Sequence, residues 1–307
     1  MPVPIPRFVR RALRDAPMAR TIAGRLGLLQ NHPFAEDKRE RLERIRPLLR
    51  TDMPHNTTPG YYDYLSPALQ RRFHITSTDN ISANAYDEFA TALIDECRDG
   101  VVLDCGAGYR SVVLDNVVNF EICSYPSTDV RGVGEKLPFK DNSFDGVLSL
   151  SVLEHVRDPF ACAREIARVL KPGGKLYSSI PFLQPLHGYP SHYFNMTHQG
   201  HKRLYEDMLE IDRQEVTTAG QPVFTLTWFL SRWLDQLPEA EREVFAHMRV
   251  GDITARPPIG MVQEPWCTLL PKDAQFELAS STALFATKSA KRPSVLTRVR
   301  GRISGGG

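Results

Sequence analysis

Residues 144–180 carry a strand pattern, a helix pattern and a second strand pattern in succession, and this order restricts the fold. The apolar segment 144–151 (FDGVLSLS) has the length of a buried strand. Asp158-Pro159 then supplies a helix cap followed by proline at the first helical position, and an amphipathic segment follows. The KPGG turn at 171–174 ends this helix, and the β-rich segment 175–180 comes next. The pattern predicts a strand–helix–strand unit of a parallel sheet.

Other segments extend this pattern in both directions. The apolar run 101–103 predicts a strand that leads directly into a turn with two glycines. A helix of about 14 residues is expected after Asp79-Asn80, ending near Gly100. The remaining assignments are strands at 119–122, 128–132 and 281–289 and helices at 223–236 and 238–248. Together they predict an α/β fold with a mostly parallel sheet.

Composition excludes several classes of protein. The 307 residues are 42% apolar, which is enough for a sizeable core, and the net charge of +2 demands no polyanionic partner. The five cysteines are odd in number and form no CxxC pair, which argues against a disulfide framework or a zinc knuckle. No run approaches the ~18 apolar residues of a membrane span, and no secretory signal is evident. We therefore expect a soluble, cytoplasmic protein.

The chain divides by composition into three parts. Residues 1–60 are expected to form a helical extension and a linker, with arginines among apolar residues over 1–30. That pattern fits a surface helix packed on its own domain, and it also fits a helix lying on a membrane surface or an organellar presequence. Residues 61–290 are expected to form the main domain, with a cofactor half at 80–182 and a substrate cover at 183–280. The basic, glycine-rich tail 291–307 is expected to be disordered.

The turn after the first strand of the sheet is the first candidate binding site, because ligands of such sheets bind beyond the carboxyl ends of strands. Gly106 and Gly108 would let a ligand approach the backbone. The dinucleotide fingerprint GxGxxG is incomplete, since Ser111 stands at the third glycine position, which argues against an NAD-dependent oxidoreductase. Asp104 would repel an anion and attract a cationic ligand such as a sulfonium. Glu121 could accept from both hydroxyls of a ribose diol, or it could be a surface acid at a strand end.

Several motifs together resemble a known family. VVLDCGAG, the acid Glu121, GEKLPFKDNSFDGVLSLSVLEHVRDP and REIARVLKPGGKLYSSIPF resemble class I S-adenosylmethionine-dependent methyltransferases, of the methyltransferase type 11-like group. The resemblance runs from about residue 80 to residue 197. It implies a doubly wound, Rossmann-like, mostly parallel seven-stranded sheet with a helical N-terminal extension and a helical substrate-cover insertion. It also implies S-adenosyl-L-methionine as the cofactor.

The resemblance further implies which residues surround the cofactor. They are Asp104, Gly106, Ala107 and Gly108 at the methionine moiety, Glu121 at the ribose, Gly134 and Glu135 at the adenine, and Leu150 and Ser151 closing over the cofactor. Glu154 and His155 would have a mainly architectural role.

Three features depart from the family pattern. Arg110 replaces a glycine, so the loop would be tighter or would recruit Arg110 for the cofactor carboxylate. Val133 stands where many relatives have an adenine-contacting Asp. Only residues 123–127 separate two parallel strands, whereas a crossover usually needs a dozen or more residues. The usual helix should therefore be missing, which leaves the adenine edge open or covered by the amino-terminal segment.

Acceptor chemistry is expected after the last strand of this unit. His187 and His192 are candidate general bases for an oxygen or nitrogen acceptor, although both could be ordinary loop residues. The spacing of His187, His192, His198 and His201 could suggest a metal site, but no nearby Cys or carboxylate pattern supports one, so no metal is expected.

The segment IPF at 180–182 lacks the Asn/Asp-Pro-Pro-aromatic tetrad of enzymes that methylate amino groups of bases or amides. This argues against nucleic acid as a partner, as does the absence of a concentrated basic-aromatic surface. The expected function is methyl transfer to a small-molecule or glycan acceptor, preferentially at oxygen. The alternative is a non-catalytic S-adenosylmethionine-binding scaffold or regulator.

Overall fold

The computed structural model describes residues 38–75, 82–188 and 191–287, which form two compact units, Met1–Asp235 and Gln236–Gly307. The expected amino-terminal helix at 1–30 and the tail at 291–307 lie outside the described residues. None of the described helices is both long enough and apolar enough to cross a membrane.

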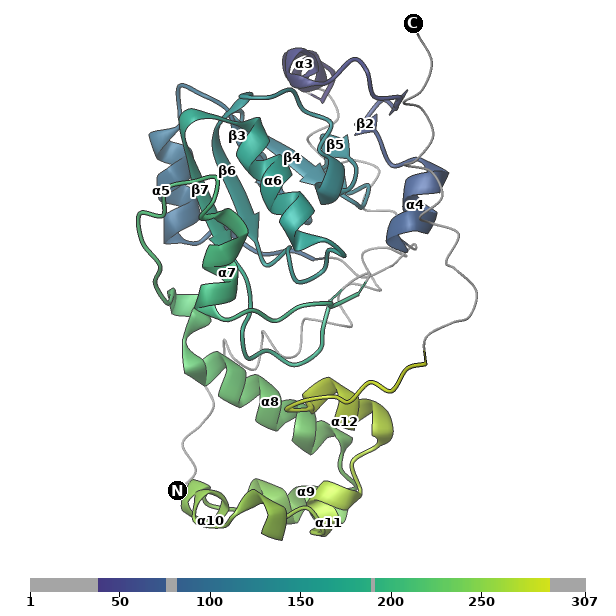
Figure 1. The fold of residues 1–307 in the computed structure, drawn as a ribbon, viewed down its shortest axis with the longest axis vertical. Helices are drawn as coiled ribbons and strands as arrows, with labels where there is room; N and C mark the ends of the chain where they lie inside the picture. The colour runs from purple at the N-terminus through teal and green to yellow at the C-terminus, as the bar shows by residue number, and fades with distance from the viewer. Residues whose placement is uncertain (1–37, 76–81, 189–190, 288–307) are drawn as a thin grey trace, which may run out of the picture. The chain divides into compact units, whose positions relative to one another are not determined.

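A seven-stranded sheet organises the described part of the first unit (Figure 1). Its spatial order is β1-β2-β5-β4-β3-β6-β7, and every neighbouring pair is parallel except β1 with β2. The strands are β1 (Asn56–Thr57), β2 (Tyr62–Asp63), β3 (Val102–Cys105), β4 (Val117–Glu121), β5 (Val130–Arg131), β6 (Phe144–Leu150) and β7 (Leu170–Ser179). The predicted mostly parallel, seven-stranded sheet is confirmed.

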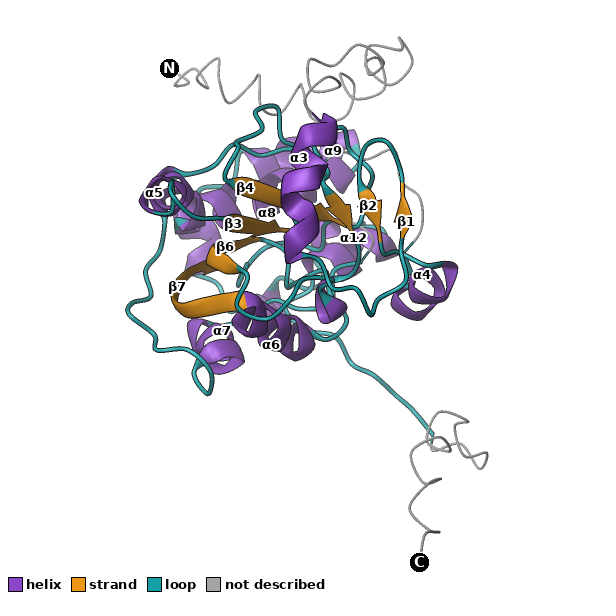
Figure 2. Ribbon diagram, turned by 90° about the horizontal axis from the view of Figure 1, so that it is seen from above, coloured by secondary structure: helices purple, strands orange, loops and turns teal. Residues whose placement is uncertain are grey.

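Helices cover both faces of the sheet (Figure 2). One core cluster joins Leu103 and Phe120 to residues of α3 (Lys38–Ile45), α6 (Pro159–Val169) and α7 (His198–Tyr205). A second cluster joins Val102 and Leu148 to α5 (Glu88–Glu96). Successive strand residues such as Val102 and Leu103 belong to different clusters, because side chains alternate between the faces of a strand. The sheet is therefore doubly wound, as the sequence predicts.

The strand–helix–strand unit forms where its pattern predicts it. The Asp158 side chain accepts a hydrogen bond from the Ala161 N–H and caps α6, and Pro159 is the first helical residue. β7 begins at Leu170, earlier than expected, and includes the KPGG turn as an irregular stretch opposite Phe144 and Gly146. At the same end, Lys171 and the Val101 N–H both bind Asp145.

Two edge strands lie at the boundary between the expected linker and the expected main domain: β1 belongs to the linker and β2 to the start of the domain. β2 pairs with β5 through Tyr62 and Val130, and β1 pairs antiparallel with β2. The Arg131 guanidinium makes two hydrogen bonds to the Asp63 carboxylate across this pair. Strand character at 56–63 was not expected, because these strands are only two residues long and depend on the edge of an existing sheet.

α3 covers the sheet where a crossover helix is missing. Residues 122–129 connect parallel strands β4 and β5 without a helix, as the short spacing predicts. Leu42 and Ile45 of α3 join the same buried cluster as Val118 and Val130. α3 thus packs on the sheet beside β4 and β5, but none of its residues lines the cavity, so whether the amino-terminal segment covers the adenine edge stays a prediction.

Buried ion pairs fix α3 to the sheet. The fully buried Asp129 carboxylate accepts from Lys38 Nζ at 2.9 Å and from Arg41 Nε and Nη2 at 2.7 Å each. Asp129 Oδ2 also accepts from the Asn119 N–H at 2.9 Å. Lys38 and Arg41 are themselves buried, although both are charged and lie on a short helix rich in charged residues.

Two element predictions are wrong. The helix expected after Asn80 begins only at Glu88, because the Asp87 side chain accepts from the Ala90 N–H and sets its start. The expected strand at 281–289 is absent over residues 281–287, the part that the structure describes. Leu284 and Phe285 are each 91% exposed there, so no sheet edge pairs with this β-prone segment.

The second unit is a small helical cluster. Its helices are α9 (Glu239–Ala246), α10 (Val250–Thr254), α11 (Pro265–Thr268) and α12 (Lys272–Leu278). The rings of Phe245 and Trp266 stack with centroids 5.1 Å apart. α8 (Pro222–Gln236) precedes this unit, and α4 (Pro67–Phe73) follows β2 in the first unit. The substrate-cover role of residues 183–280 stays a prediction.

Candidate active site

A cavity of about 2710 Å³ opens at the carboxyl ends of β3, β4 and β6. Most of the residues expected around the cofactor line it, and so does one expected base: Gly106, Ala107, Glu121, Gly134, Glu135, Leu150, Ser151 and His187. Asp104, Gly108 and His192 are not among its lining residues. The topology therefore brings together eight of the eleven expected residues around one space.

Glu121 is the last residue of β4 and is buried in the cavity wall. Its Oε2 accepts from the Gly108 N–H at 2.8 Å, and its Oε1 accepts from the N–H groups of Ile122 at 2.7 Å and Cys123 at 3.3 Å. Burial raises the pKa of Glu121, and these three N–H donors oppose that rise. The backbone thus holds a carboxylate that would otherwise be costly to bury.

The glycine turn after β3 is dictated by packing. Gly106 has φ of +86°, and a Cβ there would lie 2.4 Å from a methyl of Val152. Gly108 has φ of +63°, and a Cβ there would lie 2.6 Å from the Ser82 carbonyl oxygen. Both positions therefore need glycine before any ligand is considered. The N–H groups of Gly106 and Ala107 bind the Phe120 carbonyl and are not directed at the cavity as donors.

Asp104 is engaged by the protein itself. Its Oδ2 accepts from the Tyr86 hydroxyl at 2.7 Å and from Arg110 Nε at 2.9 Å, with Arg110 Nη2 at 2.8 Å. Burial raises the pKa of Asp104, and Arg110 opposes this rise. The Arg110 guanidinium also stacks over the Tyr86 ring at 4.0 Å and donates to the Asn84 carbonyl. These contacts tighten the loop; because Arg110 also lines the cavity, its expected role toward the cofactor carboxylate stays a prediction.

Asp104 and Glu121 were both expected to face the ligand, and only one of them faces the cavity. Glu121 lines the cavity, whereas Asp104 is fully buried and its charge is compensated by Arg110. A cationic ligand would be attracted by Glu121 and Glu135 more than by Asp104. The sequence could not reveal this, because nothing in the spacing shows that Arg110 would turn back toward a residue six positions earlier.

The residues expected at the adenine, Gly134 and Glu135, lie in the 3-10 turn Gly134–Lys136. The Glu135 carboxylate accepts from the Arg157 N–H at 3.1 Å, and burial raises the pKa of Glu135. A Cβ at Gly134 would lie 2.9 Å from Cys162 Sγ of α6, so this turn packs directly on that helix. Val133 is buried and offers no polar group, as the sequence indicates.

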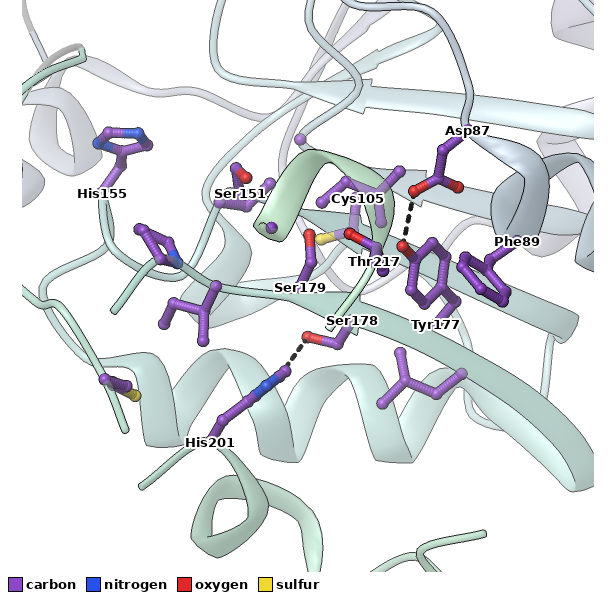
Figure 3. Close-up of a pocket in the computed structure, with 18 of the residues that line it drawn as sticks. Asp87, Phe89, Cys105, Ser151, His155, Tyr177, Ser178, Ser179, His201 and Thr217 are labelled. Carbon is purple, nitrogen blue, oxygen red and sulfur yellow. Dashed lines mark hydrogen bonds between the residues drawn. The ribbon is translucent and has the colours of Figure 1, made fainter. Parts of the chain in front are cut away.

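The opposite wall of the cavity comes from β7 and α7. Figure 3 shows the Tyr177 hydroxyl directed to Asp87 and Ser178 directed to His201. The Ser178 Oγ to His201 Nε2 distance is 2.9 Å. Burial lowers the pKa of His201. Tyr177 and Ser178 were not expected in the site, and His201 was considered only as a metal ligand, because only the topology brings α7 beside the end of β7.

The two histidines expected to act as bases differ in their surroundings. His187 Nδ1 lies 2.8 Å from the Pro185 carbonyl, and its Nε2 has no hydrogen-bond partner among the described residues. His192 Nδ1 accepts from the His187 N–H at 3.2 Å, and its Nε2 contacts Asn195 Oδ1 at 2.9 Å. Both nitrogens of His192 are thus engaged, and its position supports His187.

A group missed by sequence reasoning lies beside His187. The ring centroids of His155 and His187 are 5.3 Å apart, and both residues line the cavity. The Glu154 side chain is fully buried next to them, and burial raises its pKa to about 8. Burial likewise lowers the pKa of His155 to about 4. Residues 154 and 187 follow different strands, so only the paired ends of β6 and β7 reveal this juxtaposition.

Comparison with known proteins supports the fold and the motifs. Residues 96–178 match the family model described as a methyltransferase domain. The chain is 49% identical to the Escherichia coli protein YafE over 49 residues. This match covers 16% of this chain and 24% of that protein. It is 38% identical over 98 residues to an uncharacterized methyltransferase of Mycobacterium tuberculosis, covering 29% of this chain and 39% of the relative. The matched region thus spans well under half the length of these curated relatives.

The solved structures that the chain matches are distant. A putative methyltransferase from Bacillus halodurans is 19% identical, with a TM-score of 0.33, and the match covers 38% of this chain and 67% of that chain.

Proposed function

We propose that this chain, which carries a class I S-adenosylmethionine-dependent methyltransferase domain, transfers a methyl group to an oxygen atom of a small-molecule or glycan acceptor. S-adenosylmethionine is the cofactor of this domain family and would supply an electrophilic methyl group on a sulfonium. The observation that carries the proposal is the Glu121 carboxylate, held by backbone N–H groups in the wall of a large cavity at the strand ends.

Glu121 has the capacity to bind a ribose hydroxyl. A carboxylate offers about four lone-pair sites, and three are used by backbone N–H groups. One site therefore remains on Oε2 for a first hydroxyl. A second hydroxyl would replace the longest present bond, which joins the Cys123 N–H to Oε1 at 3.3 Å. The residues present thus fit a diol at modest cost.

The other expected contacts follow from this placement. Gly134 and Glu135 line the same cavity as Glu121, and so do Leu150, the last residue of β6, and Ser151, which follows it. Asp104, Gly106, Ala107 and Gly108 shape the turn, and Asp104 acts on it through Arg110. We propose that Asp104 fixes the loop from behind and does not touch the cofactor.

His187 is the acceptor-side residue of this proposal. Its Nε2 carries a lone pair, because Nδ1 donates to a carbonyl that can only accept. Burial lowers the pKa of His187, so the ring is neutral near pH 7. Such a ring can take a proton from an acceptor hydroxyl or bind a cation that acidifies the hydroxyl. Oxygen is preferred as the acceptor atom because the segment 180–182 lacks the tetrad associated with amino-group methylation.

Cofactor binding tests the first half of the proposal. Titration calorimetry with S-adenosylmethionine should give a saturable site in the full chain, and Glu121→Ala should weaken it by about tenfold or more, the value of one charged hydrogen bond. Glu43→Ala is the matched control, because Glu43 is an exposed acid that pairs only with Arg46 in the described residues. Equal affinity of the Glu121 and Glu43 variants would refute the cofactor position.

A second candidate is a cofactor-binding scaffold without catalysis. It is favoured by one observation, the absence of a crossover helix over residues 122–129, which removes a usual part of the adenine side. Incubation with cofactor labelled in the methyl group and with cell extract separates the two candidates. Labelled product that disappears with Glu121→Ala supports transfer, whereas binding without any labelled product supports the scaffold.

A further inference from the structure

Three side chains with metal-binding groups meet at the edge of the cavity. Glu154 and His155 follow β6, and His187 follows β7. One coordinating atom from each lies within 4.8 Å of the other two. The backbone of Gly188 is pressed so closely against the His155 ring that a Cβ there would lie 2.1 Å from it. This contact between the two strand-end segments fixes His187 beside Glu154 and His155.

The hydrogen bonds of the two histidines leave the same ring nitrogen available on each. His155 Nδ1 lies 2.9 Å from the Ser191 carbonyl, and His187 Nδ1 lies 2.8 Å from the Pro185 carbonyl. A carbonyl only accepts, so both Nδ1 atoms carry the proton and both Nε2 atoms carry a lone pair. This arrangement, with one nitrogen anchored to a carbonyl, is how metal-ligating histidines are held in orientation.

Glu154 is a buried acid without any partner in the described part of the chain that would balance its charge on ionisation. Its side chain is fully buried, and neither carboxylate oxygen has a hydrogen-bond partner among the described residues. A buried carboxyl without partners costs several kcal/mol in an apolar environment, roughly 2–7 for a neutral polar group and more for a charge. Its Oε1 lies 3.7 Å from His155 Nε2. A cation between them would offset this cost.

The spacing is close to that of a metal site. Tetrahedral coordination at about 2.0–2.2 Å places neighbouring ligand atoms about 3.3–3.5 Å apart. The Glu154–His155 pair at 3.7 Å is near this value. The widest pair of the cluster, within 4.8 Å, would need to close by roughly 1.5 Å or less. His187 lies outside the helices and strands, so it is the ligand that would shift toward the other two when an ion binds.

We propose that Glu154, His155 and His187 bind a divalent transition metal ion through two imidazoles and one carboxylate. Imidazole ligands favour Zn²⁺ and its neighbours over Mg²⁺ or Ca²⁺. Three protein ligands leave positions open, and His155 and His187 line the cavity whereas Glu154 lies behind them. The open positions therefore face the acceptor space, and their natural ligand is an acceptor oxygen, whose hydroxyl pKa a bound metal ion lowers.

The site was not visible in the sequence. No acidic residue stands near the loop histidines in the sequence. Glu154 follows β6, whereas His187 follows β7, and only the pairing of these two strands brings them together. His192 is not a ligand in this arrangement, because both of its ring nitrogens are engaged. It supports the His187 backbone instead.

Metal binding tests the proposal without reference to activity. The full chain, freed of metal by chelator and dialysis, is titrated with Co²⁺ by visible absorption and with Zn²⁺ by calorimetry. We expect one ion per chain and visible absorption of low-symmetry Co²⁺. Glu154→Gln and His187→Asn should each weaken binding by tenfold or more, whereas His201→Asn, a cavity histidine bonded to Ser178, should leave it unchanged.

Two results would overturn the proposal: no stoichiometric ion in the unaltered chain, or unchanged affinity in both Glu154→Gln and His187→Asn. His187 lies in a loop, so its variant remains informative if the buried Glu154 variant folds poorly. S-adenosylmethionine affinity, measured on the same samples, reports folding of the cavity. Because Glu121 is outside the cluster, loss of metal binding with retained cofactor binding separates this proposal from the proposed function.

Discussion

The attachment of α3 to the sheet should depend on the buried carboxylate of Asp129. Asp129→Asn keeps the size of the side chain but removes the charge that balances Lys38 and Arg41. In the unaltered protein four donor atoms point at the two carboxylate oxygens of Asp129. The amide nitrogen of the introduced Asn would itself be a donor and would face some of them. Removing one partner of a buried ion pair costs about 3–5 kcal/mol, because the remaining charge stays buried and unpaired.

This loss should be evident in thermal unfolding followed by circular dichroism. For a unit of about 200 residues, each kcal/mol lowers Tm by about 2–4 °C, so a decrease of roughly 6–20 °C is expected. Asp115→Asn is the control, because Asp115 forms an exposed pair with Arg44 of the same helix and such pairs contribute about 0–1 kcal/mol. Adding Lys38→Met to Asp129→Asn should recover part of the loss, since one unpaired buried cation is removed. Similar Tm values for the Asp129 and Asp115 variants would refute this reasoning.

Three further outcomes follow from the cavity. Gly106→Ala should destabilise the fold by roughly 2 kcal/mol or more in thermal melts, because φ is +86° and Val152 occupies the Cβ position. Adding Val152→Ala should recover the part of this loss that comes from the clash, but not the part that comes from the backbone conformation. Tyr86→Phe should cost about 1.5–3 kcal/mol by removing a hydrogen bond to the Asp104 carboxylate, and an unchanged denaturation midpoint would contradict that bond. Burial raises the pKa of Glu121, and it is the ionised carboxylate that binds the diol. Cofactor affinity, measured by calorimetry, should therefore fall as the pH decreases through that raised pKa. The affinity of Glu121→Ala should not change with pH in this range.

Local signals predicted the elements whose causes are local. Asp158 and Pro159 mark the start of α6 correctly because capping depends on neighbouring residues alone. The start of α5 was misplaced since Asp87, and not Asn80, provides the cap. The strand expected at 281–289 failed for a different reason, because a β-prone segment needs a partner edge that the sequence does not identify.

The candidate site divides in the same way. Glu121 and the glycine turn lie at strand ends that the hydrophobic pattern locates, so their convergence could be predicted. The pairing of Asp104 with Arg110 depends on side-chain direction, and the meeting of Glu154 with His187 depends on which strands are neighbours. Neither is encoded in spacing along the chain.

The position of α3 also bears on how the chain folds during synthesis. Arg41 precedes its partner Asp129 by 88 residues, so the ribosome releases the helix long before the carboxylate exists. An isolated eight-residue helix is shorter than the ~12–15 residues needed for even marginal stability in water. The segment made early must therefore wait for β4 and β5 to form. This helix, made early, is therefore among the last of the described elements to reach its native place.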